Sequence, residues 1–243
     1  MTFTLEPEDA RDYVVVGFVE LSTPGNNLGW SDAAMFNLVK ALELALNEGR
    51  DPLTGEQVGP PSGDVGQFAS LEDLLQALQA QMRYVLEAER AAYPPLTDAD
   101  RARCSFTLES IFLEDCVEQG REWRLGGAKY WHNSQHGVGI ATVANSLAAI
   151  QELVFASGDL SLAELRDVLN ADFEGHEALR QRLLNRVDHY GNDEDVVDGI
   201  AARAVAVQIV HHAAQKVWMG SNAAVRVGKR LGDRQVRFEN DPF

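Results

Sequence analysis

The chain has few cysteines. The two that it has, Cys104 and Cys116, are twelve positions apart, on what the apolar periodicity predicts to be one helix. This spacing is too wide for a CxxC metal or redox motif. We expect both cysteines to be reduced packing residues, because a free cysteine behaves as a small buried hydrophobe.

Basic residues are also scarce, with 21 Lys and Arg against 37 Asp and Glu and a formal net charge of -16. This charge repels phosphate backbones and anionic lipids, so we expect no nucleic-acid and no membrane partner. No stretch approaches the roughly 20 apolar residues of a membrane span. The first eight residues lack the basic and apolar segments of a signal peptide. We therefore expect a cytoplasmic protein.

The hydrophobic content, 45% of 243 residues, is sufficient for a sizeable core. Residues 13–19 form a short β-branched apolar run, which predicts a strand buried on both faces. It is the only strand that the pattern predicts convincingly. Because a lone strand cannot satisfy its own backbone groups, the sequence favours part of a larger α/β body or a chain that needs a partner.

Helical periodicity dominates the rest of the sequence. The first helix is expected to be capped by Ser31 and ended by Gly49. The second is expected to open with Ser70 and Asp73 as a capping box and to end at Pro94-Pro95. Further helices are predicted over residues 98–119, from 138 onward, and over 161–171, 176–186 and 193–217.

Motifs for a metal or nucleotide site are weak. Residues 137–142 contain two glycines at a helix start but lack the full GxGxxG pattern. His132 and His136 lie four positions apart without an evident third ligand. The tail after Gly220 is basic, and we interpret it as solvated rather than as an anion site. The sequence therefore predicts no metal and no cofactor-binding residues.

Glu20 is the carboxylate with most chemical interest, because it directly follows the apolar run. A carboxylate that leaves a buried strand is desolvated, which raises its pKa and suits a general base near neutral pH. The alternative is an ordinary solvated glutamate at a strand end. The pattern by itself leaves both interpretations open.

Residues 8–20, which end in Gly17-Phe18-Val19-Glu20, resemble the glycyl radical enzyme segment that leads into the active-site Gly-Cys-Val-Glu motif. Five later blocks are similar to the same family in the same order, over residues 29–37, 126–130, 137–150, 173–180 and 190–193. The chain thus resembles a pyruvate formate-lyase-like glycyl radical enzyme over about residues 8–217. Its dehydratase and uncharacterised lyase branches are the most similar.

The resemblance implies a helix-dominated α/β fold, namely part of a ten-stranded barrel with surrounding helices. We expect residues 1–243 to form a single partial domain. The family's C-terminal glycine-radical motif has no counterpart in this chain. In the family, a cysteine on a finger loop becomes a thiyl radical, and the glutamate two residues later serves as base. By position, Phe18 takes the place of the cysteine and Glu20 that of the base.

Phenylalanine offers no S–H bond, so the resemblance implies a homologue that is catalytically silent by itself. The parent chemistry is radical C–C or C–O bond cleavage in a small metabolite, in anaerobic metabolism. The chain needs no cofactor of its own, since the family's radical is installed by an S-adenosylmethionine radical activase. That activase, or a complementary or full-length homologue, is the expected partner.

The alternative is a non-catalytic assembly protein that uses the apolar strand as an interface. The sequence leaves open whether it is a truncation or one half of a split enzyme, and whether Phe18 is natural or introduced.

Overall fold

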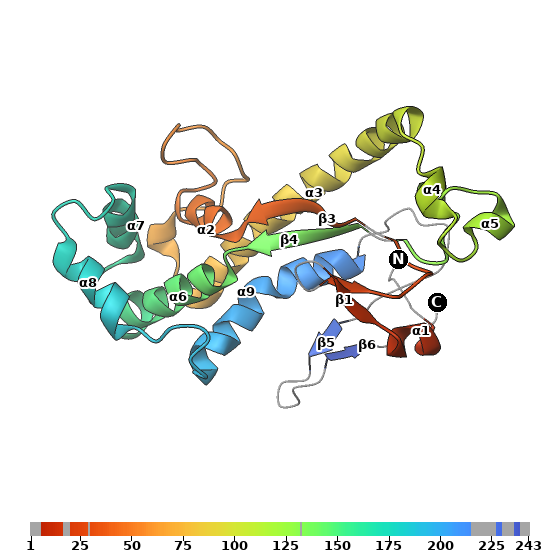
Figure 1. Cartoon of the computed structure of the whole chain (residues 1–243). Coiled ribbons are helices and arrows are strands. Elements are labelled where there is room, and N and C mark those ends of the chain that lie inside the picture. Colours follow the sequence, from red (N-terminus) through yellow and green to blue (C-terminus); the bar gives the residue numbers. More distant parts are fainter. Residues whose placement is uncertain are drawn as a thin grey trace. The chain divides into compact units, whose positions relative to one another are not determined.

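The computed structural model describes residues 6–16, 20–28, 30–131, 133–214, 227–229 and 236–238. Helices dominate it, and the strands among these residues form three two-stranded sheets, β1–β2, β3–β4 and β5–β6 (Figure 1). The chain divides into two compact units. Unit 1 comprises Met1–Met35, Arg90–His136 and Ile209–Phe243, and unit 2 comprises Phe36–Glu89 and Gly137–Gln208.

Unit 1 holds every strand among the described residues, apart from the last two residues of β3 and of β4, together with short helices. Its elements are α1 (Pro7–Arg11), β1 (Val14–Val16), β2 (Glu20–Ser22), β3 (Trp30–Asn37), α4 (Thr107–Ser110), α5 (Cys116–Gln119), the 3-10 helix η2 (Trp123–Leu125), β4 (Asn133–Val138), β5 (Val227–Lys229) and β6 (Val236–Phe238).

The first strand differs from its prediction. It ends at Val16 and pairs in antiparallel register with β2, with Val16 opposite Glu20. The prediction of a strand buried on both faces was wrong, because Val14 is 40% and Val15 54% exposed. The partner strand escaped the pattern because Glu-Leu-Ser carries no β-branched apolar run.

The helix expected from Ser31 is instead strand β3, which pairs with β4. Helix α2 begins only at Leu38, after Asn37, whose side-chain Oδ1 accepts hydrogen bonds from the backbone amides of Val39 and Lys40. Apolar spacing extends the helical period back to Met35, but strand pairing prevails there. In Figure 1 the arrows of β3 and β4 run the same way.

Unit 2 is helical. It contains α2 (Leu38–Leu46), the 3-10 helix η1 (Val65–Gln67), the first part of α3 (Leu71–Arg103), α6 (Ile140–Ile150), its continuation η3 (Gln151–Ala156) as a π-helix, α7 (Leu162–Asn170), α8 (Glu177–Arg186) and most of α9 (Asp195–Ala214). These helices enclose an apolar core whose fully buried members include Leu38, Leu74, Leu78, Leu147 and Val197.

Helix α3 continues through Pro94 and Pro95, where the sequence predicts its end. A proline inside a helix removes an amide donor and frees the carbonyl four residues earlier. Here those carbonyls belong to Arg90 and Ala91, which are exposed, so water can satisfy them. The single helix predicted over 98–119 is consequently wrong: Cys104 directly follows α3, and Cys116 is the first residue of α5.

The predicted helix starts with capping boxes are confirmed. The Ser161 side chain accepts from the Glu164 amide while Glu164 accepts from the Ser161 amide at 2.7 Å. Ser70 and Asp73 do the same at the start of α3. Helices α7, α8 and α9 match the predicted ranges closely.

None of the described helices combines the length and apolar character needed to cross a bilayer.

Candidate functional site

The candidate site is the hairpin β1–β2 in unit 1. Glu20 is the first residue of β2 and lies opposite Val16, the last residue of β1. Phe18 belongs to the three residues between the two strands and lies outside the described residues. Val14 and Val15, in the strand that was expected to desolvate Glu20, are 40% and 54% exposed.

A cluster of polar side chains lies at the base of this hairpin. The hydroxyl of Tyr130 donates to Asp9 Oδ2 at 2.5 Å, and Lys129 Nζ lies 2.8 Å from the same oxygen. The other oxygen, Asp9 Oδ1, accepts from Asn26 Nδ2 at 3.0 Å. The amide oxygen of Asn26 in turn accepts from the Thr23 hydroxyl. These five residues, Asp9, Thr23, Asn26, Lys129 and Tyr130, are called the hairpin clamp below.

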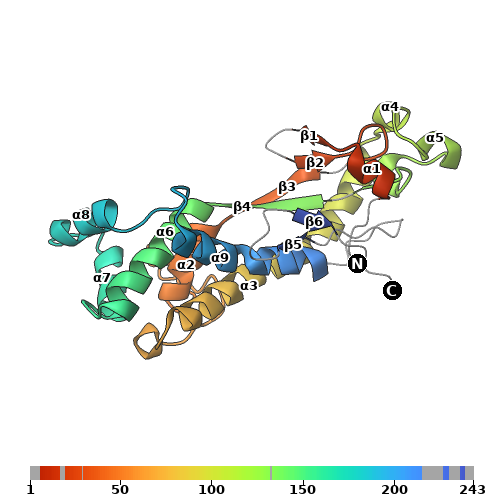
Figure 2. The ribbon, with the colours of Figure 1, turned by 90° about the horizontal axis from the view of Figure 1, so that it is seen from below.

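The chain order explains why the clamp holds both flanks of the hairpin. Asp9 lies in α1, which precedes β1, whereas Thr23 and Asn26 lie in the turn that follows β2. Lys129 and Tyr130 come from a segment more than 100 residues later, before β4. Figure 2 shows α1, β1 and β2 together within unit 1. One distant segment therefore binds both ends of the hairpin.

Backbone hydrogen bonds support the same arrangement. The Tyr130 amide donates to the Asn26 carbonyl at 3.0 Å, and the Tyr130 carbonyl accepts from the Leu28 amide at 3.4 Å. Asn27 and Tyr130 form an isolated parallel bridge. The Glu6 amide donates to the Tyr130 hydroxyl at 3.0 Å, so this hydroxyl is both donor and acceptor.

The ionisation of the clamp follows from these contacts. The hydrogen bond from Lys129, reinforced by that from Tyr130, lowers the pKa of Asp9. The same contact with Asp9 raises the pKa of Lys129. Burial is the main cause that raises the pKa of Tyr130, which is only 4% exposed. At neutral pH the clamp thus holds an ionised carboxylate, an ammonium and a neutral phenol.

The clamp residues were not assigned a role from the sequence. Asp9 and the pair Lys129 and Tyr130 fall in two separate blocks of the family resemblance. The signal that could have found them is a carboxylate just before a strand and a Lys-Tyr pair in a glycine-rich turn. Their meeting depends on tertiary structure that spacing alone does not give.

A small apolar cluster lies beside the clamp in unit 1, formed by Leu113, Cys116, Trp123, Ala128 and Trp131. Arg124 joins its edge, where the guanidinium carbon lies 3.6 Å from the centre of the Phe106 ring and one amino group pairs with Asp100. Burial raises the pKa of the Cys116 thiol, which fits a packing role rather than a reactive one.

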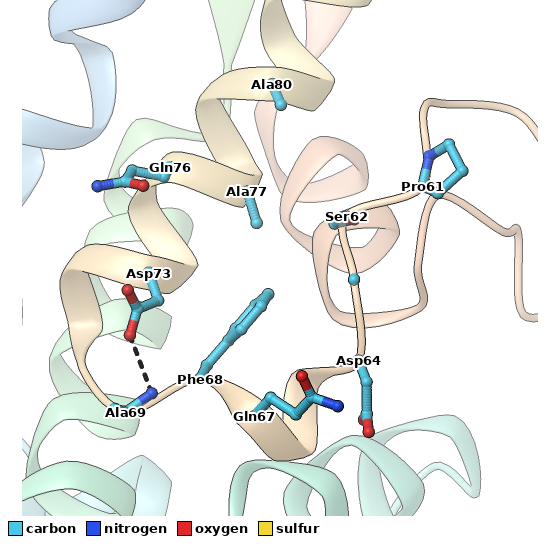
Figure 3. Close-up of a pocket in the computed structure, with 11 residues that line it drawn as sticks. Pro61, Ser62, Asp64, Gln67, Phe68, Ala69, Asp73, Gln76, Ala77 and Ala80 are labelled. Carbon is cyan, nitrogen blue, oxygen red and sulfur yellow. Dashed lines mark hydrogen bonds between the residues drawn. The ribbon is translucent and has the colours of Figure 1, made fainter.

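Other candidates are weaker. The described residues contain no group of three or more His, Cys, Asp or Glu side chains placed to hold a metal ion. His132 lies outside the described residues, and His136 lies in β4. An open cavity of about 650 Å³ lies in unit 2 between residues 61–69 and the first turns of α3 (Figure 3). Asp73 lines this cavity near the start of α3, and its carboxylate already accepts hydrogen bonds from the backbone amides of Ala69 and Ser70.

Comparison with known proteins gives a consistent result. A family model described as pyruvate formate lyase-like matches residues 1–227. The chain is 38% identical over 195 residues to (2S)-3-sulfopropanediol dehydratase of Klebsiella oxytoca, which covers 79% of this chain and 24% of that protein. It is 34% identical over 193 residues to trans-4-hydroxy-L-proline dehydratase of Clostridioides difficile, with the same two coverages.

Solved structures agree with the sequence relatives. The glycerol-bound form of the B12-independent glycerol dehydratase from Clostridium butyricum superposes with a TM-score of 0.79 at 34% identity, over 85% of this chain and 26% of that one. The chain therefore spans about a quarter of the length of the proteins it matches.

Proposed function

The chain belongs to the pyruvate formate lyase-like family, and from this membership we propose that it is a glycyl radical enzyme homologue whose own thiyl chemistry is silenced at Phe18. The observation that carries the proposal is the sequence Gly17-Phe18-Val19-Glu20. Its first three residues lie between strands β1 and β2 in the sequence, and Glu20 is the first residue of β2. The family resemblance assigns the thiyl cysteine to the position of Phe18. The relatives that support the membership are dehydratases and lyases.

The residue at position 18 does not fit the radical chemistry of the family. A thiyl relay needs an S–H bond whose hydrogen atom can be removed and returned. The benzyl side chain of Phe18 has no such bond, and a phenyl group is bulkier than the thiol that it would replace. Among the two sulfhydryl groups of the chain, Cys116 is buried and Cys104 follows α3, far along the sequence from the hairpin.

Glu20 retains the position of the family base. We propose that in the parent lineage this carboxylate took the proton of a substrate hydroxyl group. The substrate class is a small polar metabolite that loses water or another group by C–O or C–C cleavage. This class is inferred from the named activities of the relatives, which act on a sulfopropanediol and a hydroxyproline.

The experiment is an anaerobic turnover assay of three proteins: the unchanged chain, Phe18→Cys and Phe18→Ser. Each is supplied with an activating enzyme and a companion polypeptide that carries the family's glycine-radical segment. Small diols and hydroxyproline serve as substrates. The proposal expects turnover by Phe18→Cys only, because serine restores space but no S–H bond. Turnover by the unchanged chain would contradict it, as would a folded Phe18→Cys protein that carries the radical and forms no product.

A second candidate function is a non-catalytic assembly role, and exposed apolar residues favour it. Four of them lie within ten residues of one another around α4 and α5, namely Leu108, Ile111, Phe112 and Val117, with exposures of 70%, 54%, 73% and 63%. Ser110 and Leu113, which lie between them in the sequence, are buried. Exposed apolar residues this close together along the chain favour an interaction surface.

The partner that we propose for this surface is another polypeptide that carries the complementary part of a pyruvate formate lyase-like fold. The chain superposes on about a quarter of such a fold, so the remaining part supplies a surface of the right kind. Sedimentation velocity of the chain, alone and mixed with a full-length relative, tests it. Phe112→Ser is expected to weaken association, while Leu53→Ser, which changes a leucine in unit 2 that is 89% exposed, is the control. A chain that sediments as a monomer in both samples contradicts the assembly role.

A further inference from the structure

The hairpin β1–β2 has little packing of its own. Its two strands pair over three residues each. Helix α1, which leads into it, has no buried residue, and Tyr13 and Val15 are more than half exposed. An isolated two-stranded hairpin is at best marginally stable in water. Contacts outside the strands must therefore fix its orientation within unit 1.

The described residues supply such contacts at the base of the hairpin, in the clamp. Asp9 is bonded to three side chains at once, those of Tyr130, Lys129 and Asn26. The partners Tyr130 and Asn26 are buried, at 4% and 5% exposure. This differs from an exposed ion pair, which contributes little, because the carboxylate is tied by a buried phenol and a buried amide.

We propose that Asp9 and Tyr130 are positioning residues that fix the direction of the hairpin carrying Glu20 and position 18. The bond between them connects the element before β1 to the segment before β4, while Asn26 connects the same carboxylate to the turn after β2. The base of the hairpin is thereby held on both sides. The importance of Glu20 and position 18 rests on the proposed function, but the positioning of the two strands does not.

The negative charge of Asp9 contributes to this positioning. An ionised Asp9 accepts from three donors, whereas a protonated or amidated side chain at this position loses at least one acceptor site. Asp9→Asn keeps the size of the side chain and removes the charge. Tyr130→Phe keeps the ring, which packs in the interior, and removes the hydroxyl that contacts both Asp9 and the Glu6 amide. Asp9→Asn therefore weakens the bond between these residues from the acceptor side, and Tyr130→Phe removes it from the donor side.

The test is amide hydrogen exchange of the full chain, measured by mass spectrometry at neutral pH. Peptides that contain Val14–Val16 and Glu20–Ser22 report on the hairpin, and peptides from α2 and α6 serve as the internal reference. We expect exchange in the hairpin to become on the order of tenfold faster in Asp9→Asn and in Tyr130→Phe, with the reference unchanged. The double variant is expected to be slower than the sum of the two single effects predicts, because the two changes share the bond between Asp9 and Tyr130 while each also removes a contact of its own.

Matched controls separate positioning from general destabilisation. Asp51→Asn removes a carboxylate that pairs with Lys40 in unit 2, and Tyr84→Phe removes a phenol hydroxyl from the exposed face of α3. Neither is expected to change exchange in the hairpin. Hairpin exchange that stays at its original rate in both clamp variants overturns the proposal, and so does an equal acceleration in hairpin and reference.

A spin label adds a readout that a merely structural role would not move. The label is attached at Phe18→Cys in a Cys104→Ser background, because Cys104 is the exposed native thiol. Electron paramagnetic resonance is expected to show a broad line with the clamp intact and a sharper one after Asp9→Asn. Identical line shapes contradict the proposal. Neither measurement needs turnover. The positioning role can therefore be tested even if the activity assay contradicts the proposed function.

Discussion

The Tyr130 hydroxyl lies 2.5 Å from Asp9 Oδ2, although the two residues are 121 positions apart in the sequence. This bond joins the helix that precedes the candidate hairpin to the segment that precedes β4. It is accompanied by the 2.8 Å contact between Lys129 and the same carboxylate oxygen. The relationship makes the site dependent on ionisation, so pH offers a direct probe of it.

The sign of the pH effect follows from the shifted pKa values. The pKa of Asp9 is lowered from its ordinary value of 3.8. The stabilisation by its carboxylate is therefore complete above pH 3.8 and is lost as the pH falls through the lower pKa of the folded chain. The pKa of Lys129 is raised from its ordinary value of 10.5. The stabilisation by its ammonium group is therefore complete below pH 10.5 and is lost as the pH rises through the higher pKa of the folded chain. The clamp therefore stabilises the chain throughout the neutral range.

We predict that Asp9→Asn lowers the free energy of unfolding by about 1–2 kcal/mol at pH 7, as expected for hydrogen bonds to a charged group that is partly exposed. The difference from the unchanged chain should vanish well below pH 3.8, where both proteins carry a neutral side chain. Urea unfolding at a series of pH values measures it. A difference that persists unchanged in acid rules out the ionised clamp as its source.

A second prediction concerns Gly59 and Gln81 in unit 2. The Gln81 amide nitrogen donates to the Pro60 carbonyl at 2.7 Å and to the Ser62 hydroxyl at 3.0 Å. This places its oxygen so close to Gly59 that an added Cβ would lie 1.8 Å away. Gly59→Ala should therefore cost about 1–3 kcal/mol through forced displacement of Gln81.

The origin of this cost can be isolated by a double-mutant cycle. In a Gln81→Ala background the additional effect of Gly59→Ala should fall close to zero, because the colliding oxygen is gone. Gly199→Ala is the control, since a Cβ there meets nothing within 4 Å inside helix α9. That change should stabilise the chain by about 0.5–1 kcal/mol. An equal penalty for Gly59→Ala in both backgrounds is the contrary outcome.

A third prediction concerns the two thiols. Cys104 is exposed, while Cys116 is 3% exposed and has a pKa raised by burial. The thiolate is the reactive form, so Cys116 should resist modification in the folded chain. Titration with Ellman's reagent should release one equivalent from the native protein and two in guanidinium. The fast equivalent should disappear in Cys104→Ser, and a native yield of two would show that α5 does not protect its cysteine.

The sequence predicted the helices with clear capping signals well, because those signals are local. The Ser161 and Glu164 capping box marks the start of α7 through bonds that span three residues. The prediction failed where distant partners decide the structure. Residues Trp30–Asn37 have a helical apolar spacing but pair with β4, and α3 passes through Pro94 and Pro95 where exposed carbonyls can be hydrated.

The candidate site shows the same limit. The family resemblance picked out Glu20, and the structure places this residue in a hairpin that the pattern alone did not predict. The clamp was beyond the reach of the sequence, since nothing local connects Asp9 with Tyr130. Phe18, whose assignment rests on the resemblance, remains the residue on which the proposed silence depends.

The most direct test of that silence is solvent deuterium in recovered substrate. A thiol exchanges its hydrogen with D2O, so a protein that removes and returns a hydrogen atom through sulfur labels the substrate carbon. With the activating enzyme and the glycine-radical segment present, mass spectrometry of the recovered substrate is predicted to find deuterium for Phe18→Cys and none for the unchanged chain. Equal labelling by the unchanged chain would contradict the account.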